Sequence, residues 1–168
     1  MIQIRHALIT DLNSILEIVN REIIYGTAFW MTKVRTYDEQ LVWFENHEKE
    51  GFPIFVAVNE QQKILGFATY GHFRAYDGYK HTVEHSVYLI PEAQGRGLGK
   101  KLMKHLMNYA CQNNVHVMVA AITANNQASI RLHEWFGFKH AGILPQTGIK
   151  FEKWLDLLFM YKIINSDH

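Results

Sequence analysis

A glycine-rich turn, Gln94-Gly95-Arg96-Gly97-Leu98-Gly99-Lys100, carries the most visible chemistry in this chain of 168 residues. It follows an alternating apolar stretch that Pro91 interrupts, and it opens a segment of helical periodicity that runs to Cys111. Glycines at a strand-to-helix junction let backbone N–H groups approach an anion, and the N-terminus of the helix adds a positive dipole. A flexible turn before a helix is the plainer reading, but three alternating glycines with an Arg and a Lys pair favour a phosphate-binding site.

Two common phosphate-binding motifs do not match this turn. A Walker loop requires G-x-x-x-x-G-K-[ST], but Gln94 stands where its first glycine is needed and Lys101 where its hydroxyl is needed. The dinucleotide fingerprint G-x-G-x-x-G requires a glycine where Lys100 stands. The spacing that remains is Q-x-x-G-x-G at the start of a helix.

The composition favours one globular domain, residues 1–168, that binds a small ligand. Hydrophobic residues make up 48% and aromatic residues 13% of the chain, which excludes a disordered protein. Seventeen Lys and Arg balance sixteen Asp and Glu, and no run of basic residues exceeds two, so neither nucleic acid nor a membrane surface is expected as a partner. The first residues contain no apolar run typical of a signal peptide or membrane span, so we expect a cytoplasmic protein. Cys111, the single cysteine, is assigned no role.

The hydrophobic pattern predicts an α/β (α+β) chain. Strands are expected at 2–8, 53–58, 63–73, 79–90, 115–122, 139–144 and 151–163. Helices are expected after Thr10 as N-cap, from Thr36 to Gly51, from Leu98 to Cys111 and from Asn126 to Phe136. Thr36 and Glu39 have the spacing of a capping box.

These features resemble the GCN5-related N-acetyltransferases, whose pyrophosphate-binding signature has the same Q-x-x-G-x-G spacing and whose order of elements covers essentially the whole chain. The stretches T-V-E-H-S-V-Y-L, N-N-Q-A-S-I-R-L-H-E-W-F-G-F and G-I-K-F-E-K-W-L-D resemble the phosphinothricin acetyltransferases, which also acetylate methionine sulfoximine and methionine sulfone. The resemblance implies a central mixed, mostly antiparallel seven-stranded sheet, with helices on both faces and a splay between the fourth and fifth strands. It also implies transfer of an acetyl group from acetyl-CoA to the free α-amine of a small amino-acid-like substrate, in a detoxification or resistance role.

The resemblance assigns the acetyl-CoA contacts to three segments. Backbone groups of Val87, Tyr88 and Leu89 would hold the pantetheine arm, and an oxyanion donor such as the Leu89 N–H lowers a barrier by roughly 3 to 4 kcal/mol. The pyrophosphate would lie against Gly95, Arg96, Gly97, Leu98, Gly99 and Lys100. Asn126 and Ser129 would lie near the cofactor arm, and Asn126 also fits a simple helix cap.

Glu84 is the predicted general base. In an alternating strand it shares a face with Thr82 and Ser86, whereas His85 points to the other side. An amino-acid amine is mostly protonated at neutral pH, so a carboxylate nearby can remove its proton directly or through water. A solvated strand carboxylate would be the default reading, and the match to the family's T-V-E phrase favours catalysis.

His133 is the second predicted catalytic residue. It stands where many members of the superfamily carry a tyrosine that protonates the departing thiolate, and the phosphinothricin branch resembles this chain in having histidine there. An imidazole suits proton donation and proton acceptance equally. A histidine packed beside Leu132 and Trp135 without titrating is the equally weighted alternative.

The expected substrate pocket combines one cation with aromatic side chains. Arg74 is the best candidate for the carboxylate or phosphinate of the substrate, because a guanidinium binds such groups with two parallel hydrogen bonds. The other candidate substrate-binding residues are Tyr76, Tyr79, Phe29, Trp30 and Lys150. Core packing remains the alternative for the aromatic loop 26–31, and surface exposure for Lys150.

No metal is expected, although the chain has ten histidines. His81 and His85 are the closest pair, but a four-residue spacing aligns metal ligands on a helix rather than on a strand. Two other functions stay open: a non-catalytic acyl-CoA-binding module, and an acetyltransferase for protein N-termini or other amines. The apolar stretch 154–161 and the family resemblance suggest a homodimer.

Overall fold

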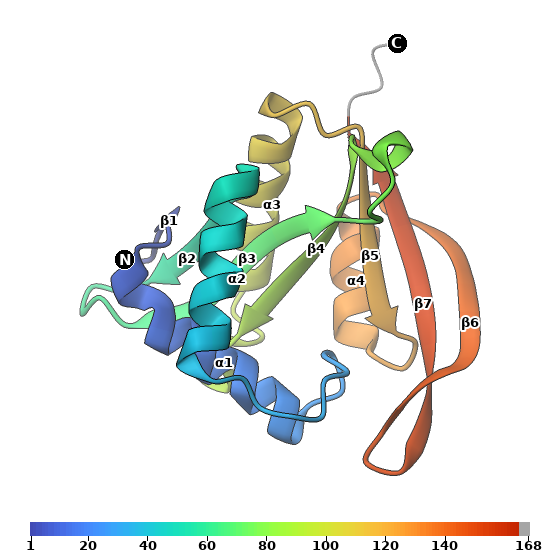
Figure 1. Ribbon diagram of the computed structural model, residues 1–168, viewed down its shortest axis with the longest axis horizontal. Helices are drawn as coiled ribbons and strands as arrows, with labels where there is room; N and C mark the ends of the chain where they lie inside the picture. The colour runs from blue at the N-terminus through green and yellow to red at the C-terminus, as the bar shows by residue number, and fades with distance from the viewer. Residues whose placement is uncertain (165–168) are drawn as a thin grey trace.

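The computed structural model describes residues 1–164, which form a seven-stranded sheet with helices on both faces (Figure 1). The strands lie in the order β1-β2-β3-β4-β5-β7-β6. The elements are β1 (Gln3–His6), α1 (Leu12–Tyr25), α2 (Tyr37–Glu50), β2 (Ile54–Val58), β3 (Ile64–His72), β4 (Thr82–Leu89), α3 (Leu98–Gln112), β5 (Val117–Thr123), α4 (Gln127–Trp135), β6 (Lys139–Lys150) and β7 (Lys153–Ile163). The predicted order of elements is confirmed.

The sheet is antiparallel except where β4 meets β5. These two strands pair in parallel only from Thr82 to Glu84 on β4, opposite Val117 to Val119 on β5. Beyond Glu84, β4 continues to Leu89 beside β3, while β5 continues to Thr123 beside β7. The two strands therefore separate, and the predicted splay is confirmed. The edge of β4 that faces β5 is left open over its second half.

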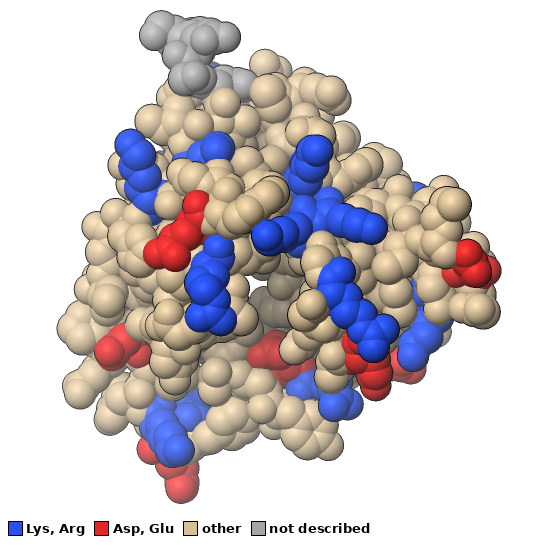
Figure 2. All heavy atoms as spheres, turned by 180° about the vertical axis from the view of Figure 1, so that it is seen from behind, with Lys and Arg blue, Asp and Glu red and all other residues tan. Residues whose placement is uncertain are grey.

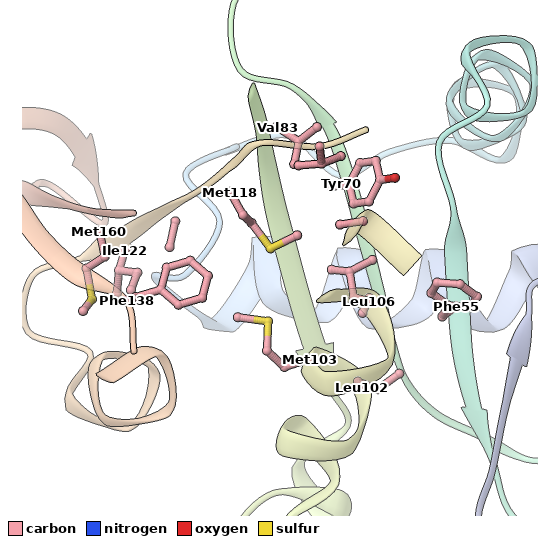
Figure 3. Packing of buried hydrophobic residues seen from close by; sticks show 14 of the residues in the cluster. Phe55, Tyr70, Val83, Leu102, Met103, Leu106, Met118, Ile122, Phe138 and Met160 are labelled. Atoms are coloured by element: carbon pink, nitrogen blue, oxygen red, sulfur yellow. The ribbon is translucent and has the colours of Figure 1, made fainter. Parts of the chain in front are cut away.

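Each face of the sheet carries its own hydrophobic core. Residues of β2 show how alternation divides the cores, because Ile54, Val56 and Val58 pack with α1 and α2 while Phe55 and Ala57 pack with α3. Leu102, Met103 and Leu106 extend from α3 into the second core (Figure 3). Full burial of one such side chain contributes about 1.5–3 kcal/mol to folding. The two cores therefore stabilise the sheet from which the splayed strands extend.

The second helix begins and ends where the sequence predicts. The Glu39 N–H donates to the Thr36 hydroxyl at 3.2 Å, and the Thr36 N–H donates to the Glu39 carboxylate at 2.8 Å, which completes the capping box. Gly51 ends the helix in the left-handed conformation with φ of 71°. Both predictions are confirmed.

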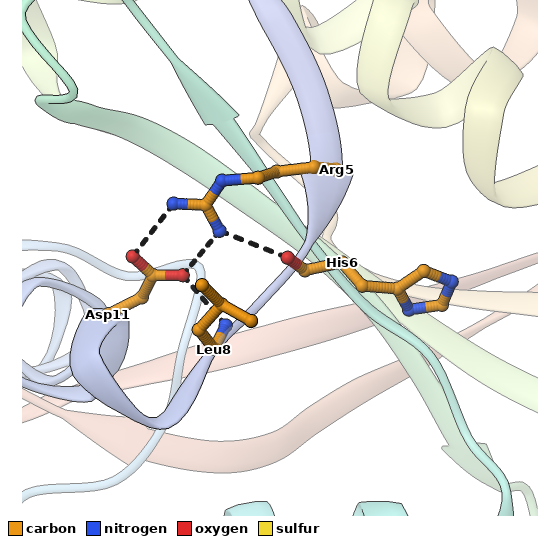
Figure 4. Close-up of polar contacts among 4 residues, drawn as sticks. All are labelled: Arg5, His6, Leu8 and Asp11. Atoms are coloured by element: carbon orange, nitrogen blue, oxygen red, sulfur yellow. Dashed lines mark hydrogen bonds and ion pairs between the residues drawn. The ribbon is translucent and has the colours of Figure 1, made fainter.

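The first helix begins differently from the prediction. Residues Ile9–Asp11 form a short 3-10 turn, and α1 starts at Leu12, so the prediction that Thr10 caps the helix is wrong. Asp11 instead holds this corner of the fold (Figure 4), accepting from Arg5 at 2.6 and 3.0 Å and from the Leu8 N–H at 2.8 Å. Burial opposes ionisation of Asp11, but the contacts with Arg5 and Leu8 outweigh it and leave the carboxyl pKa below its ordinary value.

The sixth strand is longer than predicted. We expected a strand at 139–144, whereas β6 continues to Lys150 through two shifts in its pairing with β7. Pro145 lacks an N–H, but β6 is an edge strand and can lose a hydrogen bond on its open side. The described residues, 1–164, include no helix long and apolar enough to cross a membrane.

Candidate active site

A groove of about 890 Å³ runs from the open edge of β4 to the N-terminus of α3. It is bounded by α1, the end of β4, the glycine turn and α4. The predicted cofactor-binding residues that it brings together are Val87, Tyr88, Leu89, Gly95, Gly97, Leu98, Gly99, Lys100, Asn126 and Ser129. Residues far apart in sequence thus line one continuous surface.

The glycine turn has the backbone shape that the sequence indicated. Gly95 and Gly97 adopt φ values of 71° and 75°, a left-handed conformation that disfavours other residues. Gly97 is the N-cap of α3, so the N–H groups of the following residues have no partner within the helix. A Cβ atom at Gly95 or Gly97 would meet nothing within 4 Å, so backbone conformation rather than crowding requires glycine in the free protein.

The groove also has a positive charge balance. Arg21, Lys100 and Arg131 line it from three different helices, and Glu22 is the acidic residue among its lining residues. Figure 2 shows several Lys and Arg side chains around a hollow in the face opposite to that of Figure 1. Unpaired N–H groups at a helix N-terminus together with these cations fit the phosphates of coenzyme A.

Sequence reasoning missed three of the polar residues in this groove. Gln94 belongs to the glycine-turn motif but has no predicted role, and neither Arg21 nor Arg131 is among the predicted site residues. Helical spacing offered a signal for Arg131, because Ala128, Arg131 and Trp135 lie on one face of α4. Arg21 offered no comparable signal, because its place depends on how α1 packs across the sheet.

One predicted cofactor residue has its side chain elsewhere. Arg96 lines a separate cavity of about 350 Å³, together with Ile2, Glu60 and Glu92. Its backbone remains part of the glycine turn, so a contact with pyrophosphate through the Arg96 N–H stays a prediction. The guanidinium does not add to the positive lining of the groove.

A smaller cavity of about 70 Å³ lies in the splay between β4 and β5. Val87, Tyr88, Asn126 and Ser129 line both this cavity and the groove, so the two spaces share a wall. His133 lines the smaller cavity. The predicted catalytic histidine therefore lies in the gap between the separating strands.

His133 is buried on α4, where its side chain is 5% exposed. Its Nδ1–H donates to the Ser129 carbonyl at 2.7 Å, and the Ser129 hydroxyl lies farther from Nδ1, at 3.4 Å. Burial lowers the pKa of His133, although its hydrogen bond with the Ser129 carbonyl acts in the opposite direction. The imidazole is therefore neutral at neutral pH.

His85 is the residue of this cavity that sequence reasoning missed. It projects from β4 into the splay, and its Nε2 lies 2.9 Å from Nε2 of His133. Its Nδ1–H donates to the Val119 carbonyl of β5 at 2.9 Å. Burial lowers the pKa of His85 to about 3, and the neighbouring His133 lowers it as well.

His81 and His85 do not act as a pair. His81 is exposed and contacts the Asn114 carbonyl through Nδ1 at 2.8 Å, whereas His85 is buried. Within residues 1–164, no group of three or more His, Cys, Asp or Glu side chains is placed to hold a metal ion.

Glu84 lies on the opposite face of β4 from His85. It is half-buried, and burial raises the pKa of its carboxyl, although the charge of Arg74 acts to lower it. Tyr88 shares this face and packs against Phe29 with ring centroids 6.2 Å apart. Burial raises the pKa of Tyr88 to about 12, so its hydroxyl stays protonated. Glu84 thus adjoins a partly apolar surface, and its raised pKa makes it a better proton acceptor than an ordinary carboxylate.

The predicted substrate residues fall into two groups. Arg74 and Tyr76 are exposed on the loop after β3, and the Arg74 guanidinium lies 4.2 Å above the Phe73 ring. Tyr79 closes a short 3-10 turn in the same loop. These side chains are open to solvent, and their role in substrate binding stays a prediction.

The aromatic loop 26–31 is fixed to the sheet. Trp30 donates through Nε1 to the Thr27 carbonyl and the Thr123 hydroxyl, both at 2.9 Å. Its ring covers Gly148 so closely that a Cβ atom there would lie 2.2 Å from it. The loop is therefore held against the end of β5 and against β6.

Lys150 helps to hold this loop in place. It is 3% exposed, and its ammonium donates to the carbonyls of Phe29 at 2.6 Å and Glu22 at 3.1 Å. Burial lowers the pKa of Lys150, although Glu22 acts to raise it. This geometry favours a structural role for Lys150 over the predicted contact with substrate, and the alternative of surface exposure is wrong.

Known proteins are similar to this chain in sequence and in architecture. A family model described as acetyltransferase (GNAT) domain matches residues 4–159. The L-methionine sulfoximine/L-methionine sulfone acetyltransferase of Salmonella typhimurium is 43% identical over 94% of this chain and 91% of its own. The phosphinothricin N-acetyltransferase of Streptomyces coelicolor is 34% identical over 93% of this chain and 92% of its own.

Solved structures agree with this result. The structure of yncA, a putative acetyltransferase from Salmonella typhimurium with its cofactor acetyl-CoA, has a TM-score of 0.96. Its sequence is 40% identical, over 100% of this chain and 96% of its own. The ribosomal-protein-alanine N-acetyltransferase from Brucella melitensis has a TM-score of 0.94 and 43% identity over 96% of this chain and 99% of its own. The resemblance inferred from the glycine turn and the order of elements is confirmed, and the chain belongs to the GNAT acetyltransferase family.

Proposed function

We propose that this protein transfers the acetyl group of acetyl-CoA to the free α-amine of a small amino-acid-like substrate. The substrate class is that of methionine sulfoximine, methionine sulfone and phosphinothricin, named for two of its relatives, and the role is detoxification or resistance. The observation that carries the proposal is the positively lined groove that ends at the open edge of β4, with a carboxylate on one face of that strand and histidines on the other.

Residues of the groove would bind the coenzyme through two kinds of contact. The free N–H groups at the start of α3, with Arg21, Lys100 and Arg131, suit the phosphates. The unpaired edge of β4 suits the amide groups of the pantetheine arm, which can hydrogen-bond to an open strand. Acetyl-CoA supplies an activated thioester when bound.

Two residues of this chain would then transfer protons during the reaction. Glu84 would remove a proton from the ammonium group of the substrate, since its raised pKa brings proton acceptance closer to neutral pH. Across the whole reaction an N–C bond forms, a C–S bond breaks, and the electron pair of that bond stays on sulfur. Because His133 is neutral at rest, it would first take the second proton, which nitrogen loses once the N–C bond has formed, and would then give that proton to the sulfur.

Substrate recognition would come from the loops beside this edge. Arg74 is an exposed cation whose charge acts on Glu84, so a substrate carboxylate bound to it would bring the amine near the base. The ring of Phe29, which packs on Tyr88, would form an apolar wall beside the substrate side chain. Tyr76 and Trp30 are the remaining members of the proposed pocket.

A thiol-release assay with acetyl-CoA tests the proposal. The amines should include amino acids, methionine sulfone, methionine sulfoximine, phosphinothricin, polyamines and peptides with free N-termini. The proposal predicts thiol release with the sulfone, sulfoximine or phosphinothricin class and much less with peptides. Preference for a peptide N-terminus would favour the alternative represented by the Brucella melitensis structure. Binding of acetyl-CoA without turnover of any amine would favour a non-catalytic module.

A homodimer is also part of the proposal. The edge strand β6 and its neighbour β7 expose several apolar side chains, which are Ile143, Leu144, Ile149 and Trp154. Light scattering after gel filtration should give twice the chain mass of 19.6 kDa, and a monomer would contradict this part. A cytoplasmic location stays a prediction.

A further inference from the structure

His85 and His133 form a buried pair whose hydrogen bonds do not match the protons of two neutral rings. The three close contacts join Nδ1 of His85 to the Val119 carbonyl, Nδ1 of His133 to the Ser129 carbonyl, and the two Nε2 atoms to each other. A carbonyl oxygen only accepts, so an Nδ1 atom that hydrogen-bonds to one carries a hydrogen; at His133 the contact with the Ser129 carbonyl, at 2.7 Å, is much shorter than that with the Ser129 hydroxyl, at 3.4 Å. Two neutral imidazoles then have no hydrogen left for the contact between the Nε2 atoms, at 2.9 Å.

One additional proton completes this arrangement. Placed between the two Nε2 atoms, it lets all three contacts become hydrogen bonds, and the pair then carries a single positive charge. A second proton would remove the acceptor from that contact and set two imidazolium ions against each other. The geometry therefore accommodates one proton for the pair and disfavours two.

The surroundings determine which state is occupied at rest. The pKa of His85 is affected by burial, by His133 and by the Val119 carbonyl, and that of His133 by burial and by the Ser129 carbonyl. Within the described chain, no carboxylate is among these influences. Phe138 packs on both rings, at centroid distances of 5.5 and 5.1 Å, and Glu84 points to the opposite face of β4. Burial without a counter-charge keeps the resting pair neutral.

We propose that His85 is a positioning residue for His133, and that the two imidazoles act as one unit that is neutral at rest and takes up a single shared proton. The catalytic part of this inference rests on the proposed function, in which His133 delivers a proton to the leaving sulfur. Glu84 takes the first proton of the ammonium group; the second proton, which nitrogen loses once the N–C bond has formed, passes to the pair, and the pair gives it to sulfur as the C–S bond breaks. His85 fixes the ring of His133 and shares the charge while the proton is held.

Nuclear magnetic resonance of the ¹⁵N-labelled histidine side chains, in the absence of substrate, tests the shared proton directly. Signals can be assigned by their loss in the variants His85→Gln and His133→Gln. Between about pH 8 and about pH 4, the signals of both rings should move together with one midpoint, below that of an ordinary histidine. In His85→Gln, the glutamine amide can donate to Nε2 of neutral His133, so His133 should stay neutral to lower pH. His72→Gln, which alters an exposed histidine paired with Glu50 at 3.2 Å, is the matched control and should change neither signal.

Activity measurements separate proton sharing from simple orientation. Glutamine can keep a hydrogen bond to His133 but cannot share a proton, whereas phenylalanine in His85→Phe can do neither. Both variants should lower kcat by roughly ten- to a hundredfold, which is at or below the low end of the effects of acid–base catalysis, and should alter its pH profile. Full rescue by glutamine would leave His85 with orientation of His133 as its single role and would overturn the proposal that the shared proton serves catalysis.

The resonance data decide the remaining outcomes. Three results would each overturn the shared proton. The two rings could titrate with separate midpoints, their signals could stay unchanged while the protein is folded, or the titration of His133 could be the same in His85→Gln as in the parent. If the rings titrate as one but no amine is acetylated, the proposed function fails and the inference about the pair stands. If amines are acetylated while the rings titrate separately, the proposed function stands and the inference about the pair fails.

Discussion

Glu84 of β4 and His133 of α4 lie on opposite sides of β4. Glu84 points toward the side covered by α1 and α2, while the next residue, His85, points into the splay and contacts His133 at 2.9 Å. A substrate amine at the open edge of β4 could therefore meet a carboxylate on one side and an imidazole pair on the other. This separation allows Glu84 to take the first proton of the ammonium group while the imidazole pair handles the proton that goes to sulfur.

Replacement of Glu84 by Gln tests the base. The variant should bind acetyl-CoA with the parent affinity, while kcat falls by roughly 10² to 10⁴, because the amide keeps the shape but cannot accept a proton. Calorimetry and stopped assays at several pH values measure both quantities. Glu45→Gln, an exposed change on α2, is the control. Parental turnover in Glu84→Gln would make Glu84 a structural residue.

The same substitution has an expected effect on stability. Burial raises the pKa of Glu84 in the folded state, so its contribution to stability is present at low pH and is lost as the pH rises through the folded pKa. At neutral pH the ionised carboxylate disfavours folding. The free energy of unfolding of Glu84→Gln, measured with urea, should therefore equal or exceed that of the parent at neutral pH. A clear decrease would show that the carboxylate makes a stabilising contact.

Replacement of Gly97 by Val tests the glycine turn. Its φ of 75° strains a branched side chain by about 1–3 kcal/mol, and the new side chain would stand where the backbone must approach the pyrophosphate. Calorimetry should show loss of acetyl-CoA binding. Gly51→Val is the matched control, because Gly51 has a similar φ of 71° and open space around it but lies outside the groove. Equal acetyl-CoA affinity in folded Gly97→Val and the parent would refute the phosphate-binding assignment.

Replacement of Arg74 by Ala tests substrate selection. One charge-assisted hydrogen bond contributes about 1.5–3 kcal/mol, so kcat/KM for amines with a carboxylate should fall roughly ten- to a hundredfold. Amines without a carboxylate should be affected far less. Because Arg74 acts to lower the pKa of Glu84, the acidic limb of the pH profile should also move to higher pH. Lys80→Ala, an exposed cation in the same loop, is the control, and equal losses for both amine classes would exclude Arg74 as the carboxylate anchor.

Replacement of Asp11 by Asn tests the corner where β1 meets α1. Loss of the paired contact with Arg5 should reduce the free energy of unfolding by about 1–3 kcal/mol at neutral pH. The folded pKa of Asp11 is lowered, so the stability it contributes is present above its unfolded pKa and is lost as the pH falls through the folded value. The difference between parent and variant should therefore shrink in acid. Urea unfolding measures it, Glu48→Gln is an exposed control, and a constant difference at all pH values would contradict the assignment.

Much of the fold could be predicted because its signals are local. Alternation along 79–90, the capping box at Thr36 and the glycines of the turn each depend on neighbours only a few residues away. The extension of β6 past Pro145 could not be read in this way, because an edge strand tolerates residues that usually interrupt strands. The start of α1 depended on the contact between Asp11 and Arg5, which competes with a simple cap at Thr10.

The candidate site was predictable where one segment supplies the chemistry. The turn 94–100 is such a segment, and the structure places most of its residues in the groove. The contact between His85 and His133 spans 48 residues and depends on the angle at which α4 packs beside the splay. Lys150 bonds to carbonyls more than one hundred residues away, at separations of 121 and 128, so no local pattern could indicate its burial.

The most direct test of the proposed reaction is identification of its product. Purified protein should be incubated with acetyl-CoA and methionine sulfone, and free thiol and acetylated product should be quantified together, the latter by mass spectrometry with fragmentation. The account predicts acetylation at the α-amine, in equal amount to the thiol released, and strongly reduced in Glu84→Gln. Thiol release without an acetylated amino acid, or acetylation of peptide N-termini in preference to every amino-acid analogue, would contradict it.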